Sequence, residues 1–142
     1  MTSYDPSNIF AKILRGEIPS HKVYEDEHVV AILDIMPQQP GHTLVVPKLA
    51  SRNLLDADPA VLGAAIVAVQ RLARAVKAAF AADGVIINQF NESAAGQTVF
   101  HLHFHVIPRH DDIPMKHHAR GFAPAEDLAA AAAKIRAALA AT

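Results

Sequence analysis

The chain has 142 residues, and its 13 basic and 14 acidic residues nearly cancel to give a formal net charge of −1. This balance argues against a nucleic-acid-binding protein, which normally carries a basic excess. The chain has no cysteine, which excludes disulfides and thiolate metal sites and suits the cytoplasm. The start lacks the features of a signal peptide, and no apolar stretch reaches transmembrane length without a charged residue. We therefore expect a soluble, cytoplasmic protein forming one domain over residues 1–142, with no membrane or nucleic-acid partner.

The first third of the chain predicts a short helix followed by three strands. Apolar residues lie on one side of a helix over residues 8–15, which Ser7 or Asp5 can cap and Gly16 can end. Strands are expected over three ranges, namely 22–25, 28–35 and 43–47.

Asp34 stands out in the second of these strands, because the surrounding sequence VVAILDI is otherwise apolar. A carboxylate at the end of a buried strand must be paired, hydrogen-bonded or turned toward a ligand. The loop MPQQPGH, punctuated by Pro and Gly, then carries His42 to the start of the next strand.

The middle of the chain predicts a long helix. Asp58 as cap and Pro59 at the first helical position mark its start, and we expect it to run to about Ala82, with Gly84 ending it. Its main apolar stripe is expected to be Leu62, Ile66, Val69, Ala73, Val76 and Phe80, beside a stripe of small residues, Ala64, Ala68, Ala75 and Ala79.

The last third predicts a strand over 85–90, a loop of small residues, a histidine-rich strand over 101–107, an irregular segment and a helix opened by Pro124. The buried face of that helix is expected to be Leu128, Ala132, Ile135 and Leu139. The order of elements lacks the strict strand–helix alternation of a parallel sheet. An α+β fold with an antiparallel sheet is therefore favoured.

The histidine-rich strand, HLHFHVI, alternates histidines with apolar residues. Successive side chains of a strand point to opposite faces, so the imidazoles of His101, His103 and His105 are expected on one face. Imidazole titrates near neutrality and can serve as nucleophile, proton donor or metal ligand. Such a row can grip one metal ion or line one anionic group, and the spacing alone leaves both interpretations open.

HLHFHVI matches the His-x-His-x-His-x-x signature, and the chain resembles the histidine triad (HIT) family, bacterial nucleotide hydrolase type. NIFAKILRGEIPS is similar to the opening helix of that family, VVAILDIMPQQPGHTLVVPK to its central strand–loop–strand, and AAGQTVFHLHFHVIPR to its phosphate loop and active-site strand. The resemblance covers about residues 8–110 and leaves 111–142 as a C-terminal extension with a helix. It implies a HIT-like fold, a five-stranded antiparallel sheet with two main helices, here with a C-terminal helix, and a homodimer.

The resemblance also implies an activity. Members are hydrolases or transferases that cut nucleotides at the α-phosphorus, which here points to a nucleoside phosphoramidate or a (di)nucleoside polyphosphate. The reaction would pass through a covalent nucleotidyl-histidine intermediate without any cofactor or metal. The substrate would be a purine nucleotide, a derivative of AMP or GMP.

Carried over by position, the resemblance assigns His103 as the nucleophile. His105 would touch a phosphoryl oxygen or the bridging atom, and His101 would join a hydrogen-bond network with His42. Thr98 completes the expected catalytic set. The expected nucleotide-binding set comprises Asp34 at the ribose, Gln97 at the phosphate, Asn91 at the phosphate or ribose, and an apolar slot for the base formed by Ile9, Phe10, Ile32 and Ile35.

The chain departs from its bacterial relatives where many of them bind zinc. Their Cys-x-x-Cys pair and a further histidine correspond to Asn8, Ala11 and Ala50, so we expect no structural zinc. The third triad position is His105 rather than the glutamine of the transferase branch, which favours hydrolysis.

Two other classes compete with this interpretation. One is a metal-dependent hydrolase with a strand-based site formed by His101, His103 and His42 or His105. The other is a non-catalytic nucleotide-binding or interaction protein. Metal content and activity in a chelator distinguish the first, and binding without turnover the second. His110, His117 and His118 are expected to be exposed loop residues.

Overall fold

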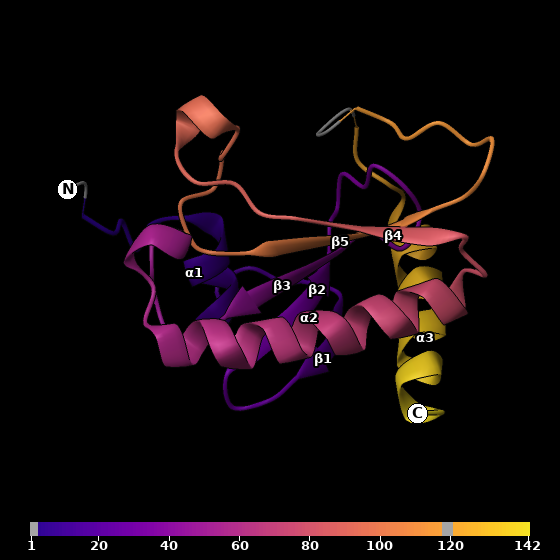
Figure 1. Ribbon diagram of the computed structural model, residues 1–142, viewed down its shortest axis with the longest axis horizontal. Helices are drawn as coiled ribbons and strands as arrows, with labels where there is room; N and C mark the ends of the chain where they lie inside the picture. Colours follow the sequence, from indigo (N-terminus) through magenta and orange to yellow (C-terminus); the bar gives the residue numbers. More distant parts are fainter. Residues whose placement is uncertain (1–2, 118–120) are drawn as a thin grey trace.

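The computed structural model describes residues 3–117 and 121–142. The strands are β1 Lys22–Glu25, β2 Val29–Leu33, β3 Thr43–Pro47, β4 Gly84–Asn88 and β5 Phe104–Arg109. The helices are α1 Ile9–Leu14, α2 Pro59–Ala79 and α3 Ala125–Ala140, with 3₁₀ turns at Leu54–Asp56 and Ser93–Ala95. All five strands pair antiparallel in the order β1-β2-β3-β5-β4 (Figure 1), which confirms the predicted α+β fold.

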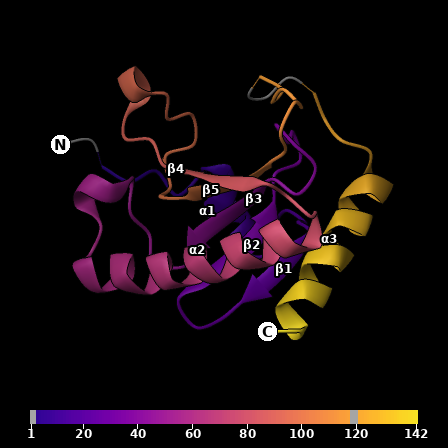
Figure 2. The same ribbon diagram turned by 45° about the vertical axis from the view of Figure 1, so that its right-hand side comes forward.

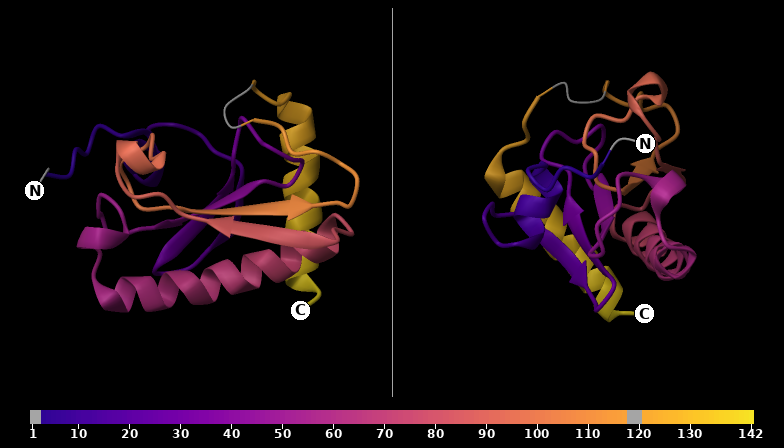
Figure 3. Two further views of the ribbon diagram at one scale, coloured as in Figure 1. Left: turned by 45° about the horizontal axis from the view of Figure 1, so that its top comes forward. Right: turned by 90° about the vertical axis from the view of Figure 1, so that its left-hand side faces the viewer.

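The two faces of the sheet are covered differently. On one face, α2 and α3 enclose the larger core, in which Ala31, Val45 and Val106 of the strands meet Leu72 of α2 and Ile135 of α3. The views in Figures 2 and 3 show α2 running along the sheet and α3 crossing near the C-terminal end of α2. The opposite face carries α1.

A smaller apolar cluster lies under α1, where Phe10 packs on Val30, Ile32, Leu44 and Val46. These strand residues alternate in sequence with those of the larger core, as the period of two in a strand requires. The α1 face is only partly covered, and it is the face on which the histidines lie.

The long helix α2 differs from the prediction at its end and on its buried face. It ends at Ala79 rather than Ala82, the chain turns through Ala81 at φ 48°, and Gly84 begins β4. Ile66 is 52% exposed, so its predicted place in the buried stripe is wrong. The buried residues are Ala65, Ala68, Val69, Leu72, Ala75 and Val76. The sheet packs on this arc because alanines beside Leu72 let the helix backbone approach closely.

The other two helices agree with the sequence in different degrees. The buried face of α3 consists of Leu128, Ala132, Ile135 and Leu139, as predicted. The cap of α1 is Asn8 rather than Ser7 or Asp5, because the Asn8 side chain accepts from the Ala11 N–H at 2.9 Å. Asp5 instead accepts from the backbone N–H and the hydroxyl of Ser7.

α2 is long and apolar enough to cross a membrane, but the core helices of globular proteins often have the same length and composition. In this fold one side of α2 packs on the sheet, and its charged residues Arg71, Arg74 and Lys77 are exposed. We therefore treat α2 as a core helix.

Candidate functional site

The histidine run enters the sheet later than predicted. The regular strand begins at Phe104, so only His105 of the three histidines lies within β5. The alternation of faces is nevertheless confirmed. Leu102, Phe104 and Val106 lie in the larger core, while the rings of His103 and His105 face each other with centroids 5.1 Å apart.

His103 is oriented by its own backbone. Its Nδ1 lies 2.7 Å from the carbonyl oxygen of His101. A carbonyl can only accept, so Nδ1 carries the proton and the lone pair of the neutral ring is on Nε2. The ring edge of Phe10 packs against His103, with centroids 4.7 Å apart. The half-buried His103 is thereby held in the tautomer that a nucleophile needs.

The rings of His42 and His105 are linked to each other by a hydrogen bond. The backbone N–H of Gln38 donates to His42 Nδ1 at 3.1 Å, which places the proton of the neutral His42 ring on Nε2. His42 Nε2 lies 2.9 Å from His105 Nδ1, so His42 donates and His105 keeps its own proton on Nε2. These hydrogen bonds place the lone pair of the neutral His103 ring on its Nε2 and the proton of the neutral His105 ring on its Nε2.

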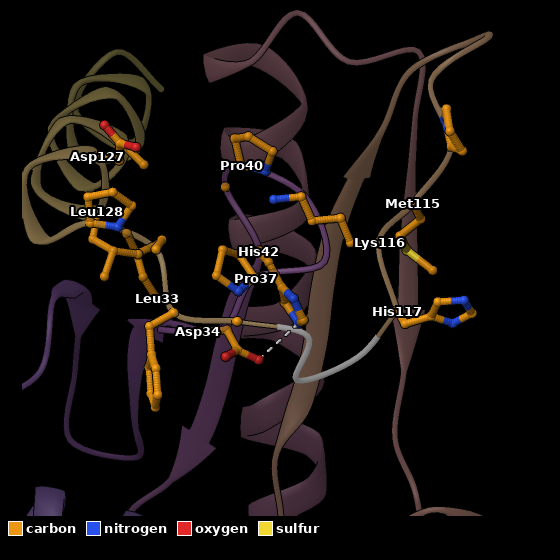
Figure 4. Close-up of a pocket in the computed structure, with 17 residues that line it drawn as sticks. Leu33, Asp34, Pro37, Pro40, His42, Met115, Lys116, His117, Asp127 and Leu128 are labelled. Carbon is orange, nitrogen blue, oxygen red and sulfur yellow. Dashed lines mark ion pairs between the residues drawn. The ribbon is translucent and has the colours of Figure 1, made fainter.

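Asp34 lies beside these linked rings. Its Oδ2 is 3.6 Å from His42 Nε2 (Figure 4), and its Oδ1 accepts from the Met36 N–H at 2.9 Å. The Asp34 side chain is 12% exposed. The carboxylate therefore joins the end of β2 to the histidine cluster, close to the side chain that orients His105.

The predicted network of His101 with His42 is wrong. Thr43 pairs with Val106 and Leu44 with His105 in the β3–β5 register, so His42 lies next to His105 and away from His101. His101 is instead fully buried, with Nε2 2.8 Å from the Pro47 carbonyl oxygen and Nδ1 2.6 Å from the Tyr4 hydroxyl. Burial lowers the pKa of His101, although the hydrogen bond to Pro47 acts in the opposite direction.

The loop before the histidines is built around Gln97, whose side chain is buried. Its amide donates to the carbonyls of Arg52 and Val99, and its carbonyl accepts from the Glu92 N–H and from Asn53. Both N–H groups of this amide are thus already donated within the protein. The structure assigns Gln97 to shaping the loop, and its predicted phosphate contact stays a prediction.

Arg52 and Glu92 are residues that the sequence did not single out. The Arg52 guanidinium donates twice to the Glu92 carboxylate at 2.9 Å and holds the pKa of Glu92 below its usual range. Asn91 accepts from the Leu54 N–H and bonds to Gln89, so it also braces this loop. Neither Arg52 nor Glu92 carries a motif, and only the contact across the fold identifies them.

The residues of the predicted base slot divide into two pairs. Phe10 and Ile32 are buried in the cluster under α1, while Ile9 and Ile35 are each 39% exposed. Thr98 is also exposed. Phe10 is the member of the slot that contacts the histidines directly.

A cavity of about 660 Å³ lies beside Asp34 and His42 (Figure 4). Its outer wall comes from the C-terminal extension, including Met115, Lys116 and Leu128. Two hydrogen bonds join Lys116 to Gln38 across this wall, from Lys116 N to Gln38 O at 3.0 Å and from Gln38 Nε2 to Lys116 O at 3.2 Å. The extension therefore braces the loop that orients His42. His117 is exposed, as predicted, and His118 lies outside the described residues.

Within the part of the chain that the structure describes, Asp34, His42 and His105 form the group that could hold a metal ion, with ligand atoms within 4.8 Å of one another. Among the described residues, the predicted alternative site of His101 and His103 with His42 or His105 is not such a group, and both nitrogens of His101 are hydrogen-bonded within the protein. The tautomers also disfavour the first group. His42 Nε2 carries a proton as long as Gln38 donates to Nδ1, and a protonated nitrogen cannot ligate a metal.

An antiparallel sheet with a row of linked imidazoles on its partly covered face defines a histidine-triad protein. The sequence model of the HIT domain family matches residues 15–112. Protein hit of Bacillus subtilis is 46% identical over 102 residues, which are 72% of this chain and 70% of that protein. A Hit-like protein of Bartonella henselae, described as involved in cell-cycle regulation, is 58% identical with a TM-score of 0.90, covering 96% of this chain and 99% of the other. The chain therefore belongs to the HIT domain family.

A functionally named relative is the adenylylsulfatase HINT3 of Arabidopsis thaliana, 41% identical over 101 residues, or 71% of this chain. The match covers 51% of that plant protein. Together with the family match, it identifies the chain as one of a family of nucleotide-binding, hydrolase-like proteins.

Proposed function

We propose that the protein hydrolyses a purine nucleotide, a derivative of AMP or GMP, at its α-phosphorus through a covalent nucleotidyl-histidine intermediate. The substrate would be a nucleoside phosphoramidate or a (di)nucleoside polyphosphate. The observation that carries this proposal is the pair of tautomers, with a lone pair on His103 Nε2 and a proton on His105 Nε2.

In the first step, His103 Nε2 forms a bond to the α-phosphorus while the bond to the leaving group breaks and its electron pair departs with that group. The His103 ring becomes positively charged, and the His101 carbonyl that accepts from Nδ1 stabilises this charge. The N–H of His105 donates to a phosphoryl oxygen or the bridging atom, where negative charge develops. Water then attacks the phosphorus and releases a proton, the N–P bond breaks, the nucleoside monophosphate leaves, and His103 regains its lone pair.

Binding would use groups around the two histidines. Asp34, the residue that follows β2, would accept from the ribose hydroxyls, and Phe10 and Ile32 would form the buried floor of the base slot. The loop residues Ser93 to Gly96 are small, which would let backbone N–H groups approach an anion; the N–H groups of Ala95 and Gly96 already donate to the carbonyls of Glu92 and Ser93. Phosphoryl transfer depends mainly on positioning and charge stabilisation, which such groups supply.

The test is to trap the intermediate. Adenosine and guanosine phosphoramidates and diadenosine polyphosphates are mixed with the enzyme, quenched in acid within milliseconds, and the peptides are analysed by mass spectrometry. We expect the nucleotidyl group on His103. His103→Ala should lose turnover but retain nucleotide binding, and His105→Ala should react more slowly while still forming the adduct.

A nucleotidyl group on His101 or His105, or normal turnover by His103→Ala, would refute the assignment. Binding without any turnover across the panel would instead indicate a nucleotide-binding protein. The values of kcat/KM across the panel identify the preferred base and leaving group.

We further propose that the protein works as a homodimer. β4 is an edge strand of the sheet, and Ile87 on it is 41% exposed. On α2, Ile66 and Val67 are 52% and 66% exposed. Edge strands and exposed apolar side chains are features that proteins normally cover, and we propose that a second copy covers them here.

A further inference from the structure

The N-terminal segment is tied to the buried end of the histidine run by a side chain that no motif identifies. The Tyr4 hydroxyl lies 2.6 Å from His101 Nδ1, across 97 positions of sequence. Because His101 Nε2 donates to the Pro47 carbonyl, Nδ1 of the neutral ring is an acceptor and Tyr4 is the donor. Chain ends are poorly ordered unless such contacts hold them.

The same hydroxyl is also bonded from the other side. Asn8 Nδ2 donates to the Tyr4 oxygen at 2.9 Å, and Asn8 Oδ1 caps α1. α1 in turn carries Phe10, which packs against the rings of His103 and His101. Tyr4 therefore reaches His103 by two routes, through the His101 carbonyl that orients it and through the helix that supports it.

Zinc does not fit at this place. The resemblance to the family implies zinc ligands at the positions of Asn8, Ala11 and Ala50, and the residues present there supply neither a thiolate nor an imidazole. Asn8 instead serves the hydrogen bonds described above. The residue after Ala50 is also joined to the histidine run, because the Leu102 N–H donates to the Ser51 carbonyl at 3.0 Å.

We propose that Tyr4 is a positioning residue of the histidine site, whose hydroxyl holds His101 through a hydrogen bond and thereby orients the His103 ring. The predicted effect of Tyr4 on turnover rests on the proposed function. The effect of Tyr4 on the tautomers of His101 and His103 is independent of any substrate.

The test compares the two tyrosines of the chain. Tyr4→Phe removes only the hydroxyl, and Tyr24→Phe removes the matched hydroxyl that bonds to Asp26 on the β1 side of the molecule. With a phosphoramidate substrate, Tyr4→Phe should lower kcat about tenfold with KM changed less than about twofold, since one buried acceptor loses its donor. Tyr24→Phe should leave kcat unchanged.

Nitrogen-15 spectra of the histidine rings supply the readout that a merely structural role would not move. The wild type should show protons on His101 Nε2 and His103 Nδ1, and Tyr4→Phe should show mixed tautomers at one or both rings. A wild-type kcat with unchanged ring spectra, or an equal fall in kcat in Tyr24→Phe, would overturn the proposal. If the wild type turns over no substrate, the proposed function fails while the spectra still decide the role of Tyr4.

A second variant keeps the test decisive if Tyr4→Phe folds poorly. Asn8→Ser retains an oxygen that can cap α1 but loses the amide donor to Tyr4. It should lower kcat about threefold. The double variant with Tyr4→Phe should be no slower than Tyr4→Phe alone, because Asn8 acts through Tyr4. Additive losses would show that Asn8 and Tyr4 act separately and would contradict the proposed route.

Discussion

Backbone groups decide which nitrogen of each site histidine carries a proton. The carbonyls of His101 and Pro47 each require a donor, and the Gln38 N–H requires an acceptor. Hydrogen bonds between side chains then determine the donor and acceptor roles of the next group, His105 after His42 and Tyr4 after His101.

Asp34→Ala should weaken nucleotide binding by about 1.5–3 kcal/mol, because a charge-assisted hydrogen bond to the ribose is lost. The measurement is calorimetric titration with a nucleoside monophosphate. Asp127→Ala is the matched control, since Asp127 also lines the adjacent cavity but lies on α3. Equal affinities for the wild type and Asp34→Ala would remove Asp34 from the binding site.

Burial of His101 predicts that the protein loses stability in mild acid. Its pKa lies below the ordinary value of 6.5, so the unfolded chain takes up this proton at a higher pH than the folded protein. The contribution of a neutral His101 is therefore complete above about pH 6.5 and declines as the pH falls below it. Urea midpoints at pH 7.5 and 5.5 should differ more in the wild type than in His101→Gln.

His28→Gln serves as the control for this comparison, because the side chain of His28 is 55% exposed. It should retain the pH dependence of the wild type. If His101→Gln keeps the full dependence as well, the acid sensitivity arises from other groups.

At the scale of elements, the loop between β4 and β5 is held by hydrogen bonds from residues elsewhere in the chain. Glu92 adopts φ 75°, a left-handed conformation that is unfavourable for a residue with a side chain. Its carboxylate is bonded to Arg52 and Asn53, and its N–H to Gln97. These contacts hold the strained residue in place and thereby define the path of the loop into the histidine run.

Gln97→Ala should therefore destabilise the protein by about 1–3 kcal/mol, because four hydrogen bonds are lost and buried partners remain unsatisfied. Binding of a nucleotide with an intact phosphate should weaken as the loop loosens. Gln70→Ala on the exposed side of α2 is the matched control and should have little effect. Unchanged urea midpoints for Gln97→Ala would contradict the bracing role.

At the scale of the whole molecule, the surface of α2 and β4 predicts a dimer. Sedimentation at micromolar concentration should give twice the 15.2 kDa mass of one chain. Val67→Glu places a charge in the expected interface and should yield monomers, whereas Ala129→Glu on the exposed side of α3 should not. A single-chain mass for the wild type would exclude the dimer at that concentration.

Much of the fold could be predicted from local sequence patterns. The alternation of Leu102, Phe104 and Val106 with histidines placed the imidazoles on the face opposite the larger core. The Asp58-Pro59 start of α2 and the buried face of α3 were likewise predictable, because caps and helical spacing depend on neighbouring residues. The His-x-His-x-His run pointed to the family on the same local basis.

What only the tertiary structure decided were partnerships between distant segments. The register of β3 against β5 placed His42 beside His105 rather than His101, and the packing of the sheet chose the alanine-rich arc of α2 over the one containing Ile66. Gln97 became a brace, and Tyr4 a partner of His101, through contacts across 45 and 97 positions. The periodicity of a sequence indicates which face of a helix or strand a residue lies on. The partner it meets depends on strand register and helix placement, which are properties of the folded chain.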